Sequence, residues 1–335
     1  MFPKTRTSTI ALAAAIVLLA GCSLAGPQIA APPARPTSQA PLGHRLDFLA
    51  QRDRDRELVW RANPGHGWIS SSLPQHIVYV SDEGGQTVYI FPQLGQNQTP
   101  IGMITSGVLA PNGLFVDAHG DLYVCNFGGG TVTVYHRGSI TPFRTLMGAG
   151  SAIDVVVGLD GSVYVSDWDS GSNGRIVEYA PRHTSPSQTI DVNGGPEGLA
   201  LDKTNNLFVA YNDITSSDGE VLEFAPGSTT GTNLGIHIGN AGGATIDSDQ
   251  NLLLVDQNIP GVDVFPPGQT TPSKQITGFS LAFDVALTAS DDRLWITQPF
   301  TAVNEVKYPS GKTFNSITNT ITSAFGVATS PHGSY

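Results

Sequence analysis

From residue 76 onwards, short apolar runs and polar turns follow one another in an order that repeats along the chain. The stretch "PNGLFVDAHGDLYVCNFGGGTVTVYHRG", from Pro111, holds an apolar strand, a polar turn, a second strand, a glycine-rich connection and a third strand. The same order returns in "GSAIDVVVGLDGSVYVSDWDSGSNGRIVEYAPR", from Gly150, and in "GPEGLALDKTNNLFVAYNDITSSDGEVLEFAPG", from Gly195. Short alternating runs bounded by Gly, Asn and Asp are typical of β-strands. The pattern therefore predicts a series of small antiparallel sheets.

The second strand of each repeat is an apolar run that ends in a polar or aromatic residue. The six runs are "IVYVSD", "LYVCN", "VYVSD", "LFVAY", "LLLVD" and "LWITQ", which end at Asp82, Asn126, Asp167, Tyr211, Asp256 and Gln298. Successive ends are 44, 41, 44, 45 and 42 residues apart. A period near 40–50 residues with several strands per unit is typical of β-propeller blades. We therefore predict an all-β fold, a six-bladed β-propeller.

The two ends of the repeat region each carry part of a blade. The first run, "IVYVSD", has no innermost strand before it, and the chain ends with an innermost strand and turn, "SAFGVATSPHGSY", that have no second strand after them. Pairing the two removes the open sheet edges that invite aggregation. We expect residues 76–335 to form a propeller closed by the C-terminal strand pairing with the N-terminal blade.

The N-terminus has the pattern of an export signal. Lys4 and Arg6 precede the apolar run "IALAAAIVLLA", which is too short for an ordinary spanning helix. The run leads into "LAGC", which resembles a bacterial lipobox and implies an acylated Cys22. The alternative is an ordinary signal peptide with a chance Cys. Residues 1–21 are thus the predicted lipoprotein signal peptide, and the expected location is the bacterial cell envelope, lipid-anchored on the periplasmic or outer-membrane side.

Residues 22–75 are predicted to be a tether to the lipid bilayer. They begin Pro- and Ala-rich, which favours extended, semi-rigid chain, and "RLDFLAQRDRDRELVWRA" within them could form a short helix. Cleavage would change the net charge from −11 to −13, because Lys4 and Arg6 are lost. Such an acidic chain is a poor nucleic-acid binder, since binding requires basic patches. With Cys22 acylated, Cys125 has no disulfide partner and is expected to be a small buried residue.

The repeat resembles a known family. "PNGLFVDAHGDLYVCN" and "PEGLALDKTNNLFVAYN" are similar to the NHL-repeat consensus and to the wider gluconolactonase-like and senescence-marker-like six-bladed propellers. The resemblance spans residues 76–335 and implies the fold. It carries little about function, because one fold hosts unrelated activities.

Three oxygen-bearing residues precede innermost strands in consecutive repeats: Asn112, Asp154 and Glu197. We expect them around the channel mouth, where such oxygens could hold a divalent cation, possibly Ca²⁺. In gluconolactonase-like enzymes the metal is held by carboxylates and an Asn at such positions, and Asn112 in "PNGL" matches best. The family's early Glu in an "EGP" phrase has no counterpart here. The competing interpretation is that these residues only cap strand ends.

The loops after the second strands form the expected recognition surface. On that face we place Asp82, Asn126, Asp167 and Asp256, with aromatic groups at Trp168, Tyr211 and Phe300. Aromatic side chains beside acidic ones suit contacts with a protein or a small-molecule or sugar ligand. The chain has no G-x-S-x-G elbow and no phosphate-binding loop.

Three functions are compatible with these features. The first is a membrane-anchored binding or scaffold module. The second is a metal-dependent lactonase-like hydrolase, and the third is a propeller-type lyase, for which no His or Tyr acid–base group can be assigned. Three oxygens near one point with an open coordination position would favour an enzyme. A channel mouth filled by Phe283, Phe325 and other apolar groups would favour binding.

Overall fold

The computed structural model describes residues 67–96, 99–168 and 173–333. The chain divides into two compact units, Met1–Pro41 and Leu42–Tyr335, and every described residue lies in the second. Cys22, the predicted signal peptide and most of the predicted tether lie outside the described residues. Within the described ranges there is no helix with the length and apolar character that crossing a bilayer requires.

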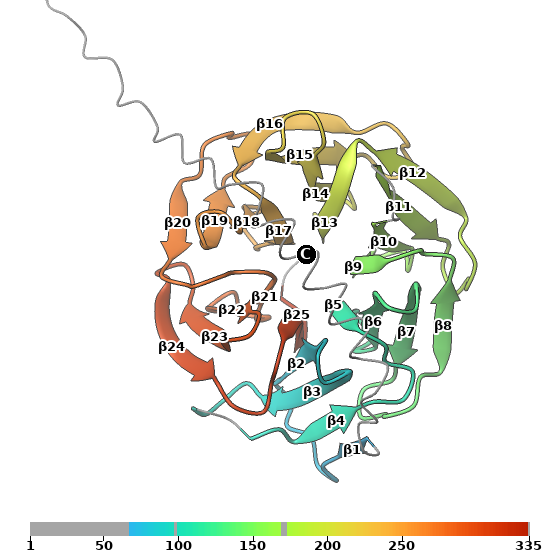
Figure 1. The fold of residues 1–335 in the computed structure, drawn as a ribbon, viewed down its shortest axis with the longest axis vertical. Coiled ribbons are helices and arrows are strands. Elements are labelled where there is room, and N and C mark those ends of the chain that lie inside the picture. Colours follow the sequence, from blue (N-terminus) through green and yellow to red (C-terminus); the bar gives the residue numbers. More distant parts are fainter. Residues whose placement is uncertain (1–66, 97–98, 169–172, 334–335) are drawn as a thin grey trace, which may run out of the picture. The chain divides into compact units, whose positions relative to one another are not determined.

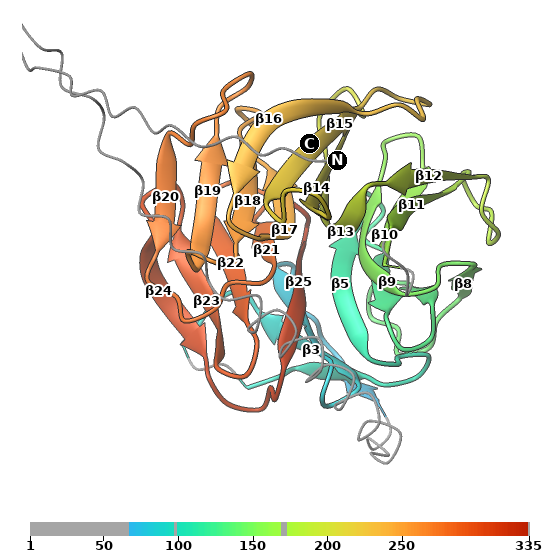
Figure 2. The ribbon, with the colours of Figure 1, turned by 45° about the horizontal axis from the view of Figure 1, so that its top comes forward.

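The described residues form 25 strands in six sheets, arranged as a ring around a central axis (Figures 1 and 2). The sheets are blade 1 with β25 (Ala324–Ser330), β2 (Ile77–Asp82), β3 (Thr87–Pro92), β4 (Gly102–Ile104) and β1 (Trp68–Ile69); blade 2 with β5 (Pro111–Val116), β6 (Leu122–Asn126), β7 (Thr131–Tyr135) and β8 (Arg144–Met147); blade 3 with β9 (Ala152–Val157), β10 (Val163–Asp167), β11 (Gly174–Tyr179) and β12 (Gln188–Val192); blade 4 with β13 (Gly194–Leu201), β14 (Leu207–Asp213), β15 (Gly219–Phe224) and β16 (Thr232–Ile238); blade 5 with β17 (Ala241–Ile246), β18 (Leu252–Asp256), β19 (Gly261–Phe265) and β20 (Lys274–Thr277); and blade 6 with β21 (Val285–Leu287), β22 (Arg293–Gln298), β23 (Ala302–Lys307) and β24 (Lys312–Ile317). The predicted six-bladed β-propeller is confirmed.

The predicted closure is also confirmed. β25 pairs antiparallel with β2 in the register Val327↔Val80 and becomes the innermost strand of blade 1. β1 pairs with β4 at the outer edge of the same sheet. This short strand lies in the segment predicted to be tether, so the described sheet begins upstream of residue 76.

Each blade runs from an innermost strand at the axis to an outer strand at the rim (Figure 1). The loops between second and third strands, together with the segments that enter the innermost strands, lie on one face, here called the mouth face. The turns that join innermost and second strands lie on the opposite, turn face. In these turns an Asp side chain holds the reversal: Asp117 Oδ1 accepts the N–H groups of His119 and Asp121, both at 2.9 Å.

The core lies between neighbouring blades. The inner strands are buried along their whole length, as in β2, β5 and β9, because each sheet is covered on both sides by the next blades. The outer strand β12 instead alternates between buried and exposed positions. Cys125 on β6 is fully buried within this packing, as expected.

Candidate functional site

The registers of the innermost strands define which residues are equivalent around the axis. Five of the six strands contain a register shift near their start, so simple comparison of the sequence phrases misaligns them by one residue. The residues that pair with the middle of each second strand are Leu114, Val155, Leu199, Ala244, Val285 and Val327. The residues before them form the axial ring: Gly113, Asp154, Gly198, Gly243, Asp284 and Gly326. The residues one step earlier form the mouth ring: Asn112, Ile153, Glu197, Gly242, Phe283 and Phe325.

Glycine occupies four of the axial-ring positions because neighbouring strands approach very closely there. A Cβ atom at Gly326 would lie 2.1 Å from the carbonyl oxygen of Asn112, and one at Gly198 would lie 2.5 Å from that of Gly242. Both distances are far shorter than van der Waals contact. A side chain is therefore tolerated at this level only where it forms a specific interaction with the next blade.

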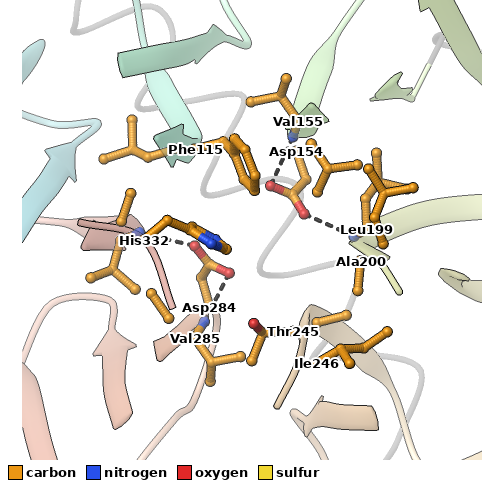
Figure 3. A pocket seen from close by; sticks show the side chains of 17 residues that line it. Phe115, Asp154, Val155, Leu199, Ala200, Thr245, Ile246, Asp284, Val285 and His332 are labelled. Atoms are coloured by element: carbon orange, nitrogen blue, oxygen red, sulfur yellow. Dashed lines mark hydrogen bonds between the residues drawn. The ribbon is translucent and has the colours of Figure 1, made fainter. Parts of the chain in front are cut away.

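Asp154 and Asp284 are the two side chains that meet this condition. Asp154 Oδ1 accepts the N–H of Val155, and its Oδ2 accepts the N–H of Leu199 on the following blade, both at 2.8 Å. Asp284 repeats the arrangement, with Val285 at 2.8 Å and Val327 at 2.9 Å. Each carboxylate thus links its own strand to the next one around the ring (Figure 3).

The two carboxylates come from blades 3 and 6, which lie opposite each other, and both point into one axial cavity (Figure 3). The cavity has a volume of about 40 Å³ and is lined mainly by aliphatic groups of the innermost strands. Burial raises the pKa of Asp284 to about 7. Burial also raises the pKa of Asp154 well above its usual range, and the charges of Asp284 and Glu197 act in the same direction. Neither acid was picked out by its proper position from sequence, because the register shift conceals their equivalence.

His332 closes the turn-face end of the cavity. It lines both the axial cavity and a pocket that opens on the turn face, and its ring stands 4.5 Å from that of Phe115, centroid to centroid. Burial of the imidazole lowers its pKa to about 4. Sequence analysis assigned His332 only a turn role, because nothing in "SPHGSY" indicates that this turn reaches the axis.

The mouth ring fills the other end. Phe283 and Phe325 meet edge to face at 4.7 Å between ring centroids, and Ile153 is buried beside them in the ring. Phe325 and Asn112 are each only 1% exposed, so no open funnel leads inward at these positions. The arrangement is the apolar closure that was predicted to favour binding over catalysis.

The predicted cation residues are all buried in this region. Asn112 and Glu197 belong to the mouth ring, whereas Asp154 belongs to the axial ring, one register position further along its strand. The amide nitrogen Nδ2 of Asn112 is buried and has no hydrogen-bond partner among the described residues. Within those residues no three or more His, Cys, Asp or Glu side chains gather in a way that could hold a metal ion. A cation at Asn112, Asp154 and Glu197 stays a prediction.

The polar ends of the second strands are engaged by the protein's own backbone. Each ties its strand to the segment that enters the innermost strand of the same blade. The bonds run to Asp82 from the N–H groups of Thr322 (3.0 Å) and Ser323 (2.9 Å), to Asn126 from Leu109 (2.9 Å), to Asp167 from Gly150 (2.9 Å) and Ser151 (2.6 Å), and to Asp256 from Gly239 (3.1 Å) and Asn240 (3.3 Å). These four side chains hold the mouth-face loops in place.

The aromatic residues predicted for this face differ in exposure. Tyr211 is buried and donates its hydroxyl to Glu220 at 2.9 Å, and Trp168 is half-buried. Phe300 is 52% exposed and stands over Phe325, 6.4 Å away between ring centroids. Two aliphatic residues that sequence analysis missed accompany it on neighbouring loops: Ile214 is 49% exposed and Ile259 is 58% exposed. Single apolar residues in long polar loops carry no signal of their own.

The chain matches no protein-family profile and no curated protein by sequence. It does match solved structures in fold. One is the crystal structure of a nidogen/laminin complex, with a TM-score of 0.62, 15% identity, and coverage of 76% of this chain and 98% of that chain. Another is a putative gluconolactonase, with a TM-score of 0.53, 17% identity, and coverage of 70% and 87%. A protein of unknown function from Bacteroides caccae gives 0.57 and 12%, covering 76% and 98%.

At such identities the similarity shows the fold alone. It agrees with the six blades of this structure, and it confirms at the level of fold the resemblance to gluconolactonase-like propellers read from the repeats. The activity of any of these proteins does not follow for this chain.

Proposed function

We propose that this chain is a non-enzymatic binding module of the bacterial cell envelope that engages a protein partner through its mouth face. The observation that carries the proposal is the apolar character of this face. Phe283 and Phe325 fill the mouth, and Ile214, Ile259 and Phe300 expose apolar side chains on the loops of three consecutive blades. Clustered exposed apolar groups on one face are typical of interaction sites.

The chemistry of the face favours a protein over a sugar. Sugars stack on flat aromatic rings, whereas Ile214 and Ile259 offer branched aliphatic tips. The exposed neighbours Thr215, Asn258 and Thr301 are polar but uncharged. Protein interfaces combine such features, with apolar groups at the centre, few charges, and a polar rim.

The proposal includes attachment to a membrane through Cys22. Two or three acyl chains on one Cys anchor a protein stably, because each buried CH₂ contributes about 0.8 kcal/mol. The support is the "LAGC" sequence and the Pro-rich segment that follows it. In this arrangement the segment 22–75 holds the propeller away from the bilayer.

The mouth-face proposal is tested with a triple variant, Ile214→Ser, Ile259→Ser and Phe300→Ser, in the purified mature protein. Chemical crosslinking in an envelope fraction should yield one saturable protein adduct with the wild type, and the triple variant should lose it. The matched control is Leu94→Ser, Phe143→Ser and Leu159→Ser, which removes exposed apolar groups outside the mouth face, at 70%, 47% and 58% exposure. Equal loss in both variants, or retention in the first, would contradict the proposal.

A metal-dependent lactone hydrolase is the second candidate. The observations that favour it are the unpartnered Nδ2 of Asn112 and the effect of the Glu197 charge on the pKa of Asp154, which indicates that these acids interact. A metal held there would polarise a lactone carbonyl. A lactone-hydrolysis screen of the calcium-loaded protein tests it, and turnover that disappears in Asn112→Ala would replace the binding proposal.

A further inference from the structure

The axial cavity contains two acids and no basic group that could balance them. Asp154 and Asp284 point into it from opposite blades, and no Lys or Arg is among the residues that line it (Figure 3). Each carboxylate oxygen accepts a single backbone N–H. A carboxylate oxygen has two lone pairs, so one acceptor position per oxygen is left.

A third oxygen points at the same space. Thr245 on β17 is 9% exposed, and its hydroxyl is directed into the cavity between the two acids (Figure 3). This hydroxyl makes no hydrogen bond with any described residue. Buried hydroxyl groups in folded proteins nearly always have a partner, so an unpartnered one aimed at two carboxylates indicates that something else occupies the cavity.

The size and charge of the cavity restrict what that occupant can be. A volume of about 40 Å³ is too small for an organic ligand. On the same measure one water molecule needs about 10–15 Å³, so an ion with one or two waters would fit. Two ionised carboxylates buried together without a counter-charge are strongly unfavourable, and a cation removes this penalty. Carboxylate, hydroxyl and water oxygens are the donors that hard cations prefer.

We propose that Asp154, Asp284 and Thr245 form a cation site on the axis of the ring, which takes a hard divalent cation of the Ca²⁺ class. The ion joins blades 3, 5 and 6 at their innermost strands and so acts as a structural clip across the ring. This site is distinct from the predicted mouth cluster of Asn112, Asp154 and Glu197, with which it shares only Asp154. His332 stands between the cavity and the turn-face pocket, so the ion enters from that side.

The test is a calcium titration of the chelator-treated mature protein, followed by thermal unfolding and by elemental analysis after gel filtration. We expect one Ca²⁺ per chain and a saturable rise in Tm. Asp284→Asn should weaken the apparent affinity at least tenfold, and Thr245→Val, which is isosteric and removes only the hydroxyl, severalfold. Asp191→Asn, an exposed acid on the outer strand β12, serves as the charge control and should titrate like the wild type.

Two further comparisons make the result decisive. Each variant must show wild-type circular dichroism and cooperative unfolding without cation, and if Asp284→Asn does not fold, Thr245→Val decides. Glu197→Gln separates the two sites: loss of the calcium response in Glu197→Gln but not in Asp284→Asn would assign the ion to the mouth cluster and overturn the proposal. A Tm that is unaffected by Ca²⁺ would overturn it as well, since the acids would then be neutralised by protons.

Discussion

Asp154 and Asp284 face each other across the axis from opposite blades, and each accepts one backbone N–H from its own strand and one from the next blade. The pair has two consequences for the molecule. It links blade 3 to blade 4 and blade 6 to blade 1, and the second of these links holds the closing strand β25. It also places two acids where water cannot solvate them, and the stability of the ring then depends on what neutralises them.

The first prediction concerns the pH dependence of the cation-free protein. The pKa of Asp284 is raised to about 7 in the fold, from an unfolded value of 3.8, so the native state binds more protons between these values. The free energy of unfolding should therefore fall as pH rises from about 4 to 7. The loss should reach a few kcal/mol, since each pKa unit corresponds to about 1.4 kcal/mol. Urea unfolding in chelator at several pH values measures it, and Asp284→Asn should flatten the profile. An unchanged slope in that variant would contradict the assignment.

The second prediction concerns His332, which acts in the opposite direction. Its pKa is lowered to about 4 from 6.5, so between these values the unfolded state binds more protons. Stability should be lost as pH falls from about 6.5 towards 4. His332→Gln should remove this loss and leave the profile dominated by the acids. The same urea series provides the measurement, and it is best made in the Asp284→Asn background. A double variant that still loses stability below pH 6 would point to another group.

The third prediction tests the close approach of strands at the axis. Gly326→Ala would place a Cβ 2.1 Å from the carbonyl oxygen of Asn112, so backbone must move. We expect a loss of at least about 1–3 kcal/mol in unfolding free energy, the usual cost of overpacking. Gly129→Ala is the matched control, because its Cβ would meet its nearest neighbour at an ordinary 3.4 Å. Equal stability of the two variants in chemical denaturation would show that the axis is looser than described.

The fourth prediction concerns ring closure. A chain truncated after Thr320 lacks β25 and leaves the inner edge of β2 unpaired. It also loses the N–H of Val327 that Asp284 accepts. Exposed strand edges promote association, so the truncated protein should aggregate or lose cooperative unfolding. Size-exclusion chromatography and calorimetry report both effects. A truncated chain that melted like the full protein would refute closure by the C-terminal strand.

The fifth prediction concerns the anchor, which lies outside the described residues. Cys22→Ala should abolish acylation and shift the protein from the membrane to the soluble fraction in a cell fractionation. The propeller should fold normally in this variant, because its described strands begin at Trp68. Mass spectrometry of the wild-type N-terminus provides the second readout. A wild type that is soluble and cleaved elsewhere would show that "LAGC" is not used as a lipobox.

Much of this protein could be predicted from local pattern. The apolar strand "VYVSD" and the turn "LDGS" each report their own conformation, and the 41–45 residue period then determines how many blades exist. The unpaired phrases at the two ends of the repeat region were sufficient to predict the closure that β25 and β2 form. These features depend on residues near one another in sequence or on simple counting, so no three-dimensional information is needed.

The site itself depended on the tertiary structure. A one-residue register shift decides that Asp154 is equivalent to Gly113 and Gly198, and no periodicity in the sequence reveals where a bulge falls. The pairing of Asp154 with Asp284 joins residues 130 positions apart, and it exists only because six blades bring blades 3 and 6 to opposite sides of the axis. The burial of His332 likewise follows from where the last turn packs. Side-chain environment at the axis is a property of the closed ring, and it appears only when all six innermost strands are in place.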